Sequence, residues 1–251
     1  MALEYTIRDE RRNGLEWHRL ARVMENASAL DILQWAVDRF FPNLTFATGF
    51  GIDGCVLLDL IGRHRLPIDL FTLDTGLLFP ETYQLWRRLE ARYGLTIRAV
   101  EPDLRVDEQA RQYGPNLWAR EPDRCCELRK VVPLRRELQR FDAWVTAIRR
   151  EQTPQRADAH VVEWDAKFDL VKINPLVRWT KKEVRAYVLQ NDVPYNPLHD
   201  QGYASIGCMP CSSPVQPGED DRAGRWRGHG KTECGLHGAP VPVAYVTTSR
   251  K

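Results

Sequence analysis

Residues 44–54 have the sequence LTFATGFGIDG, in which a short apolar run leads into a turn with three glycines. The run LTFAT (44–48) is of β type, and a helical stretch follows the glycines. Glycines at such a turn leave the backbone free to approach a ligand, and a helix N-terminus attracts anions. The stretch therefore predicts a strand–turn–helix unit of an α/β fold.

Three interpretations of this turn compete. The glycines fit G-x-G-x-x-G, and Asp74 lies 20 residues beyond Gly54, where dinucleotide-binding enzymes place an acid on the ribose. The turn could instead need backbone freedom alone, or bind the phosphate of another nucleotide. A second glycine-rich turn and a hydride-transfer constellation are not apparent in the sequence, which weighs against the dinucleotide interpretation.

The pattern on both sides of the turn predicts the rest of the fold. Two amphipathic helices are expected over residues 15–40, with capping boxes predicted at Ser28 and Thr180. Strands that alternate with helices predict a parallel sheet covered on both faces, an α/β fold. The further strands are expected at 68–73, 96–100, 143–148 and 170–175, and the further helices at 80–93, 124–141 and after Thr180.

We expect a nucleotide-binding α/β domain over residues 1–205, including the N-terminal helices, and a C-terminal segment over 206–251. Periodicity disappears after about Pro194, where glycine, proline and charged residues dominate. Such a composition cannot bury a core of its own, so we expect an ordered but mobile tail rather than a second globular unit.

Composition limits the classes of function. With 43% hydrophobic and 28% charged residues, the 251-residue chain has the composition of a globular protein. The sequence has no apolar stretch typical of a signal peptide or membrane span, so we expect a cytoplasmic protein whose cysteines are ligands or catalytic thiols. A net charge of +2 is too small for a nucleic-acid binder, although the net-basic second half suits a small anionic ligand.

Four of the six cysteines form two pairs. Cys125 and Cys126 are adjacent, and Cys208 and Cys211 form a C-x-x-C. Four thiolates can close a metal site, but adjacent cysteines fit poorly around one tetrahedral zinc ion. They fit more easily around a cuboidal cluster, where each thiolate can bind a different iron. The chemistry favours one 4Fe–4S cluster, and a four-cysteine zinc-binding interaction protein is the alternative.

The other two cysteines differ in setting. Cys55 lies in an apolar helical stretch, as a buried small hydrophobe does. Cys234 lies in KTECGLHG (231–238), among charged and polar residues such as Lys231 and His237. A thiol in a polar setting is usually kept for its reactivity, so Cys234 is the candidate nucleophile.

These motifs together point to a known family. RCCELRKVVPL (124–134), GCMPC (207–211) and ECGLH (233–237) resemble the assimilatory adenylyl-sulfate (APS) reductases, the iron–sulfur branch of the phosphoadenylyl-sulfate (PAPS) reductase family. FTLDTGLLFPETY and DDRAGRW extend the resemblance, which covers about residues 40–238. It implies a PP-loop (adenine nucleotide α-hydrolase-like) α/β domain that reduces APS to sulfite and AMP in cysteine biosynthesis. The implied electron donor is thioredoxin or glutaredoxin, acting through an S-sulfocysteine intermediate.

The resemblance also implies roles for individual residues. Cys234 would be the nucleophile, the two cysteine pairs would hold the 4Fe–4S cluster, and Lys130 would link cluster and substrate. The family usually has a serine where Gly49 stands and a glycine where Ala147 stands. The implied substrate-binding residues are Lys130, Arg222, Arg225, His237, Thr48, Gly49, Phe50, Gly51, Leu73, Ala147 and Arg149.

Two alternatives remain within this group of enzymes. A PAPS reductase would need a pocket for a 3′-phosphate, which Arg149, Arg150 or Arg156 could form. A PP-loop enzyme that uses ATP would need a turn richer in serine than T-G-F-G-I-D (48–53). We expect APS to be preferred, and we expect a homo-oligomer with no nucleic-acid or membrane partner.

Overall fold

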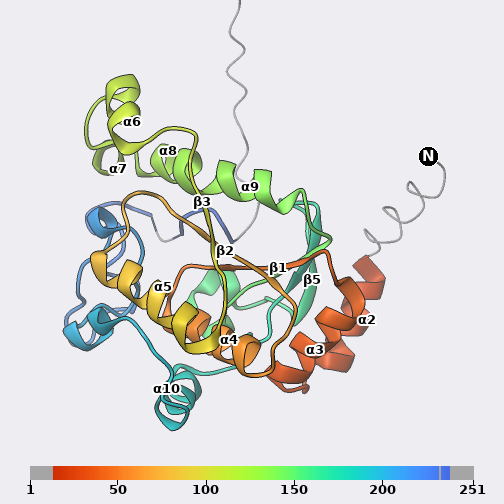
Figure 1. Cartoon of the computed structure of the whole chain (residues 1–251). Helices are drawn as coiled ribbons and strands as arrows, with labels where there is room; N and C mark the ends of the chain where they lie inside the picture. Colours follow the sequence, from red (N-terminus) through yellow and green to blue (C-terminus); the bar gives the residue numbers. More distant parts are fainter. Residues whose placement is uncertain (1–13, 232, 238–251) are drawn as a thin grey trace, which may run out of the picture.

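A computed structural model describes residues 14–231 and 233–237. Its centre is a six-stranded sheet in the order β3-β2-β1-β4-β6-β5 (Figure 1). All pairings are parallel except that of β5 with β6. The strands are β1 (Leu44–Thr48), β2 (Asp69–Leu73), β3 (Arg98–Val100), β4 (Ala143–Val145), β5 (Val162–Asp165) and β6 (Leu170–Ile173).

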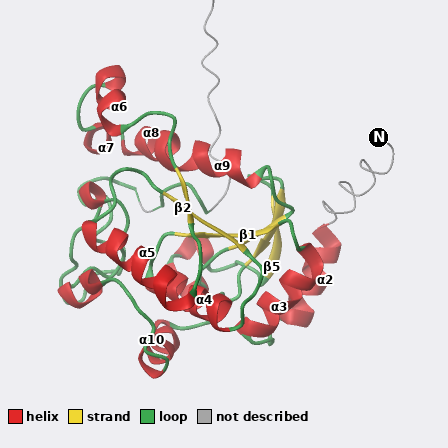
Figure 2. Cartoon of the chain, in the orientation of Figure 1, coloured by secondary structure: helices red, strands yellow, loops and turns green. Residues whose placement is uncertain are grey.

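Helices lie on both faces of this sheet (Figure 2). The capping boxes predicted at Ser28 and Thr180 are present, and each begins a helix. The helices are α2 (Gly14–Met24), α3 (Ala29–Phe40), α4 (Ile52–Arg63), α5 (Pro80–Tyr93), α6 (Val106–Tyr113), α7 (Leu117–Arg120), α8 (Pro122–Cys126), α9 (Val132–Leu138) and α10 (Lys181–Gln190).

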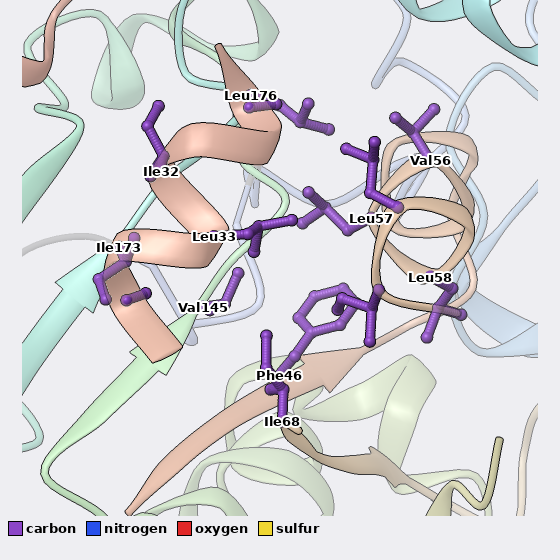
Figure 3. Close-up of a cluster of buried hydrophobic side chains, with 14 of the residues drawn as sticks. Ile32, Leu33, Phe46, Val56, Leu57, Leu58, Ile68, Val145, Ile173 and Leu176 are labelled. Atoms are coloured by element: carbon purple, nitrogen blue, oxygen red, sulfur yellow. The ribbon is translucent and has the colours of Figure 1, made fainter. Parts of the chain in front are cut away.

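Alternation along the strands divides the core into two layers. Ala143 and Val145 pack on the face covered by α3 and α4, whereas Trp144 between them packs on the face covered by α9. Successive strand side chains point to opposite faces, so one strand supplies both layers. The first layer is shown in Figure 3, where α3 and α4 bring Leu33 and Leu57 together above the sheet. The expected α/β architecture is therefore confirmed.

Several local features differ from the sequence prediction, which included neither α6 nor α7. Strand β5 was not predicted, since VEWD is short and half polar, and it joins the sheet as an antiparallel edge. The helix expected over 124–141 is interrupted by a π-helical turn, Glu127–Val131. Pro133, the second residue of α9, has no N–H to continue the α-helical ladder, so the backbone adapts at this point.

The C-terminal segment packs against the sheet domain. Leu78 and Cys208 form an isolated antiparallel bridge, and the Met209 N–H donates to the Leu77 carbonyl at 2.7 Å. Short 3-10 helices at Pro197–Gln201 and Met209–Cys211 replace regular helices here. The boundary between residues 205 and 206 stays a prediction. Within the described residues, no helix is long and apolar enough to cross a membrane.

Candidate active site

The strand order creates a crevice at one edge of the sheet. From β1 the chain moves outward to β2 and β3 and then returns to β4 on the other side of β1. The loops that follow β1 and β4 therefore diverge, which is where open α/β sheets bind ligands. A cavity of about 230 Å³ lies there, lined by Thr48 at the end of β1, Leu73 at the end of β2 and Ala147 after β4.

The glycine-rich turn forms one wall of this cavity. The Thr48 hydroxyl accepts the Phe50 N–H at 3.1 Å, and Phe50 adopts a positive φ of 56°. Gly51 is the N-cap of α4 and supplies no side chain to its first N–H groups. A Cβ on Gly49 or Gly51 would meet no described atom within 4 Å, so the space beside the turn is open to a ligand. The geometry is that of an anion site at a helix N-terminus.

Two of the predicted substrate residues have side chains outside the cavity lining. The Phe50 ring is buried and stacks on Trp86 with ring centroids 5.6 Å apart. Arg149 donates from Nε to Asp53 at 2.6 Å and also contacts Glu151, so it braces the turn from behind. Phe50 can therefore contribute to the cavity only through its backbone, and Arg149 only through the residues that it holds.

Cationic side chains from distant parts of the chain gather opposite the turn. Lys130, Arg222, Arg225 and His237 all line the cavity, as does Cys234. Arg225 lies over the Trp226 ring at 4.4 Å from its centroid and donates from Nε to the Cys211 carbonyl at 3.3 Å. The residues predicted from DRAGR and ECGLH thus meet the glycine-rich turn in space.

His237 is held as a neutral side chain. Burial, together with the charges of Arg156, Lys172, Arg222 and Lys167, lowers the pKa of His237 well below its usual value. Its Nδ1 is buried and has no hydrogen-bond partner among the described residues. A neutral imidazole with a free ring nitrogen at the cavity can bond a ligand without adding charge.

Cys234 is set apart from the other cysteines by its electrostatics. Burial raises the pKa of its thiol, but the Lys130 ammonium, the Leu236 N–H and the Arg225 guanidinium outweigh burial, so the pKa of Cys234 is lowered. The thiol is partly exposed. A stabilised thiolate at a cavity wall is a nucleophile. Cys55, by contrast, is fully buried, and burial raises its pKa.

The two cysteine pairs line a second, narrow cavity, together with Leu77, Trp118, Pro122, Arg129 and Lys130. Burial raises the pKa of Cys126 to about 12 and that of Cys211 to about 11. The Thr75 hydroxyl lies 3.2 Å from the Cys208 sulfur, and the Gln109 amide lies 3.9 Å from that of Cys125. Over residues 14–231 and 233–237, no three His, Cys, Asp or Glu side chains are grouped as one bound metal ion requires.

Lys130 lies in the wall between the two cavities and lines both. Its side chain comes from the π-helical turn and is buried. Burial lowers the pKa of this ammonium, but the Cys208, Cys234 and Cys126 thiols oppose burial and raise the pKa above its usual value. Lys130 therefore keeps its proton between the cysteine cavity and Cys234.

The sequence prediction missed several residues that line the larger cavity. Trp144 and Arg156 each have a buried nitrogen without a hydrogen-bond partner in the described part of the chain. No motif identified them as a set, because they come from a strand interior and a 3-10 turn far apart in sequence. The lining residues that the sequence did not single out are Thr72, Thr75, Trp144, Thr146, Ser205, Ile206 and Leu236, and the sequence indicated Arg156 only as a possible partner of a 3′-phosphate.

The dinucleotide interpretation fails at Asp74. Its carboxylate accepts the Tyr83 hydroxyl at 2.6 Å and the Gly76 N–H at 2.9 Å. Asp74 is not among the residues that line the cavity, so it is not placed to bind a ribose beside the glycine-rich turn. Its role is to fix the loop that follows β2.

A mostly parallel sheet with a glycine-rich turn at its switch point is the architecture of the PP-loop type of nucleotide-binding protein. Within this class, the chain is distinguished by the Cys234 thiol, which lies opposite that turn and has a lowered pKa. Residues 43–214 match the phosphoadenosine phosphosulfate reductase domain, and the chain belongs to this family.

Relatives and solved structures agree with this assignment. The chain is 50% identical over 210 residues to adenosine 5′-phosphosulfate reductase 1 of Bacillus subtilis (strain 168), covering 83% of this chain and 90% of that protein. PAPS reductase from Candida auris is 36% identical with a TM-score of 0.70, over 79% of this chain and 95% of that chain. Yeast FAD synthetase, 18% identical with a TM-score of 0.51 over 74% of this chain and 66% of that chain, shares the fold alone.

Proposed function

We propose that this chain is an adenylyl-sulfate reductase, an oxidoreductase of sulfate assimilation that converts APS to sulfite and AMP. The observation that carries the proposal is Cys234, whose pKa is lowered at the wall of the nucleotide cavity. The relative from Bacillus subtilis carries the name of this activity at 50% identity.

The first step is a sulfuryl transfer. The Cys234 thiolate attacks the sulfur of APS, the bond from that sulfur to the bridging oxygen breaks, and AMP leaves with the electron pair. The enzyme is left with S-sulfocysteine at Cys234. Arg222 and Arg225 would neutralise the phosphosulfate, and His237 would donate or accept one hydrogen bond without adding charge.

The second step releases sulfite. A thiolate of a dithiol protein of the thioredoxin or glutaredoxin class attacks Sγ of Cys234, and the bond to the sulfonate breaks. Sulfite leaves with the electron pair, so that the donor thiol is oxidised and the sulfur of the substrate is reduced. The second donor thiol then resolves the mixed disulfide and returns the Cys234 thiol.

Cys125, Cys126, Cys208 and Cys211 would hold one 4Fe–4S cluster. The four thiols line one narrow cavity beside the Arg129 and Lys130 side chains, whose charges suit an anionic group. The raised pKa values of Cys126 and Cys211 fit thiols that stay protonated until a metal displaces the proton. When bound, the cluster would supply fixed negative charge next to Lys130.

APS rather than PAPS is the proposed substrate. A 3′-phosphate needs its own cationic partners. Arg150 is held by both carboxylate oxygens of Glu25, at 2.6 and 3.1 Å, and Arg149 by Asp53. Arg156 lines the cavity but pairs with Glu233 at 2.9 Å. The similarity to the Candida auris PAPS reductase makes PAPS reduction the second candidate.

The test compares sulfite release from APS and from PAPS under anaerobic conditions with thioredoxin supplied. We expect kcat/KM for APS to exceed that for PAPS by at least about tenfold, or about 1.4 kcal/mol. Equal or better turnover of PAPS would contradict the substrate assignment.

A variant separates the covalent mechanism from binding. Cys234→Ser should still bind AMP and keep its cluster, yet release no sulfite. Normal turnover by this variant would rule out the S-sulfocysteine step. Ser at any one of the four ligand positions should remove the cluster and with it the activity.

The thiol steps need a reducing compartment, so the proposal includes a cytoplasmic setting. We also propose that the enzyme is a homo-oligomer. Light scattering of the anaerobically purified protein would give its mass in solution, and a monomer would contradict this part of the proposal.

A further inference from the structure

The two residues that flank Cys234 are each anchored to a different part of the sheet domain. On one side, the Glu233 carboxylate accepts from Arg156 at 2.9 Å, from Arg222 at 3.2 Å and from the Thr153 hydroxyl at 3.3 Å. The Glu233 side chain is only 13% exposed, and that of Arg156 only 10%. Removing one partner of such a buried pair leaves an uncompensated charge, so the contact holds Glu233 firmly.

On the other side, the Gly235 carbonyl accepts from the Lys167 ammonium. Lys167 lies in the turn between β5 and β6, the antiparallel hairpin that the sequence did not predict. Gly235 has a φ of 82°, which favours glycine, and a Cβ there would lie 3.5 Å from the Val131 side chain. The chain thus bends sharply directly after the thiol, and Lys167 holds the bend.

We propose that Glu233 and Lys167 form a clasp (these two side chains and their partners) that positions the Cys234 thiolate for attack. Neither side chain is among the residues lining the substrate cavity. Lys167 contacts the backbone next to Cys234, whereas Glu233 also holds Arg156 and Arg222, which do line the cavity. A misplacement of the nucleophile by about 1 Å can cost about 10²-fold in rate. The inference rests on the proposed function, since it assigns positioning residues to the same reaction.

If the clasp positions Cys234, its loss should have effects that differ from those of a general loss of stability. Loss of either contact should release the backbone around Cys234 while the nucleotide turn, formed by other elements, stays intact. The free thiol should then react faster with a small alkylating agent, while its reaction with bound APS becomes slower. Mere destabilisation of the fold would impair nucleotide binding as well.

Four variants test the clasp in the full-length, cluster-containing protein. Lys167→Met removes the contact, Lys167→Arg can restore it, and Glu233→Gln weakens the other contact. Lys182→Met, on the exposed face of α10, is the matched control. Alkylation of Cys234 by iodoacetamide is followed by peptide mapping, with buried Cys55 as an internal reference. The rates are compared at the high-pH plateau, where a changed thiol pKa has no effect.

We expect Lys167→Met and Glu233→Gln to alkylate at Cys234 at least about threefold faster than wild type. In a single turnover with saturating APS and no thiol donor, they should form the S-sulfonate adduct at least about tenfold more slowly. AMP affinity of Lys167→Met should not fall by more than about twofold, since Lys167 does not line the cavity and contacts only the Gly235 carbonyl there. Lys167→Arg should recover most of the rate, and Lys182→Met should match wild type.

The outcomes separate the clasp from the proposed function. Wild-type alkylation and adduct rates in both clasp variants would overturn the clasp. In Lys167→Met, a fall in AMP affinity that matches the loss of rate would also overturn it, because it would indicate an effect on ligand binding or on general stability. If the wild-type protein forms no adduct, the proposed function fails, and the alkylation rates still decide whether the clasp holds Cys234.

Discussion

Trp144 and His237 stack with their ring centroids 5.5 Å apart and their planes inclined by 18°. The contact joins the middle of strand β4 to the segment that carries Cys234, and both rings line the substrate cavity. A sheet residue thus sets how close the C-terminal segment lies to the nucleotide turn.

The stack leads to a prediction for His237. His237→Ala removes a ring contact worth about 0.5–1.5 kcal/mol, so KM for APS should rise by about two- to tenfold. His237→Phe keeps a ring and should recover part of this loss. Steady-state kinetics on both variants provide the measurement. If alanine and phenylalanine gave equal KM values, the ring nitrogen and not the stack would be the important contact.

A second prediction concerns pH. The pKa of His237 is lowered well below its usual value. In the folded protein the His237 ring therefore stays neutral at a pH where the same ring in the unfolded chain binds a proton, below about pH 6.5. The unfolded state then binds more protons, and stability must fall as pH decreases through that range. The urea midpoint should drop more in wild type than in His237→Phe between about pH 7 and about pH 5.5. Equal drops would contradict a neutral buried His237.

The third prediction concerns a buried carboxylate remote from the cavity. Asp59 on α4 is fully buried and accepts from Arg63 at 2.8 Å and from the Tyr93 and Tyr187 hydroxyls at 2.6 Å each. It therefore ties α4 to α5 and α10. Asp59→Ala leaves two half-buried tyrosine hydroxyls without their acceptor and should lower the free energy of unfolding by about 2–4 kcal/mol.

Urea denaturation would measure this loss. Tyr187→Phe removes one hydrogen bond and should cost only about 1 kcal/mol. Asp38→Asn, on the exposed face of α3, is the control and should change stability by less than about 0.5 kcal/mol. A loss below about 1 kcal/mol for Asp59→Ala would show that the network contributes little.

The fourth prediction concerns Lys130, which lines both cavities. Lys130→Met removes the cation beside Cys234 and should lower kcat by about 10²-fold, because electrostatic stabilisation of the developing charge is lost. The protein should remain brown, with about four irons and four labile sulfides per chain, because the thiols are unchanged. Metal analysis and kinetics on the same sample check both parts. Loss of the iron with this substitution would instead assign Lys130 to holding the cluster.

Local signals in the sequence were enough for most elements of the fold. The run LTFAT with its glycines predicted β1, the turn after it and the start of α4, and the capping boxes at Ser28 and Thr180 predicted two helix starts. Such features depend on neighbours a few residues away, so the sequence states them directly. The spacing of the cysteines likewise marked two pairs and two separate thiols, Cys55 and Cys234.

Only the tertiary structure decided which polar side chains meet. Arg149 and Arg156 are seven residues apart in one loop, yet the first braces Asp53 behind the turn and the second lines the cavity. The sequence could not predict which of the two arginines faces the cavity, because the 3-10 turns between them set the directions of their side chains.

The same holds for Cys234 and Lys130, which are more than a hundred residues apart in the sequence. Composition around Cys234 indicated a reactive thiol, but the cation that stabilises its thiolate comes from a π-helical turn whose place is fixed by the sheet. Helix and strand periods are local properties of the chain. The pKa of a thiol depends on burial and on charges brought near by folding, and these exist only in the tertiary structure.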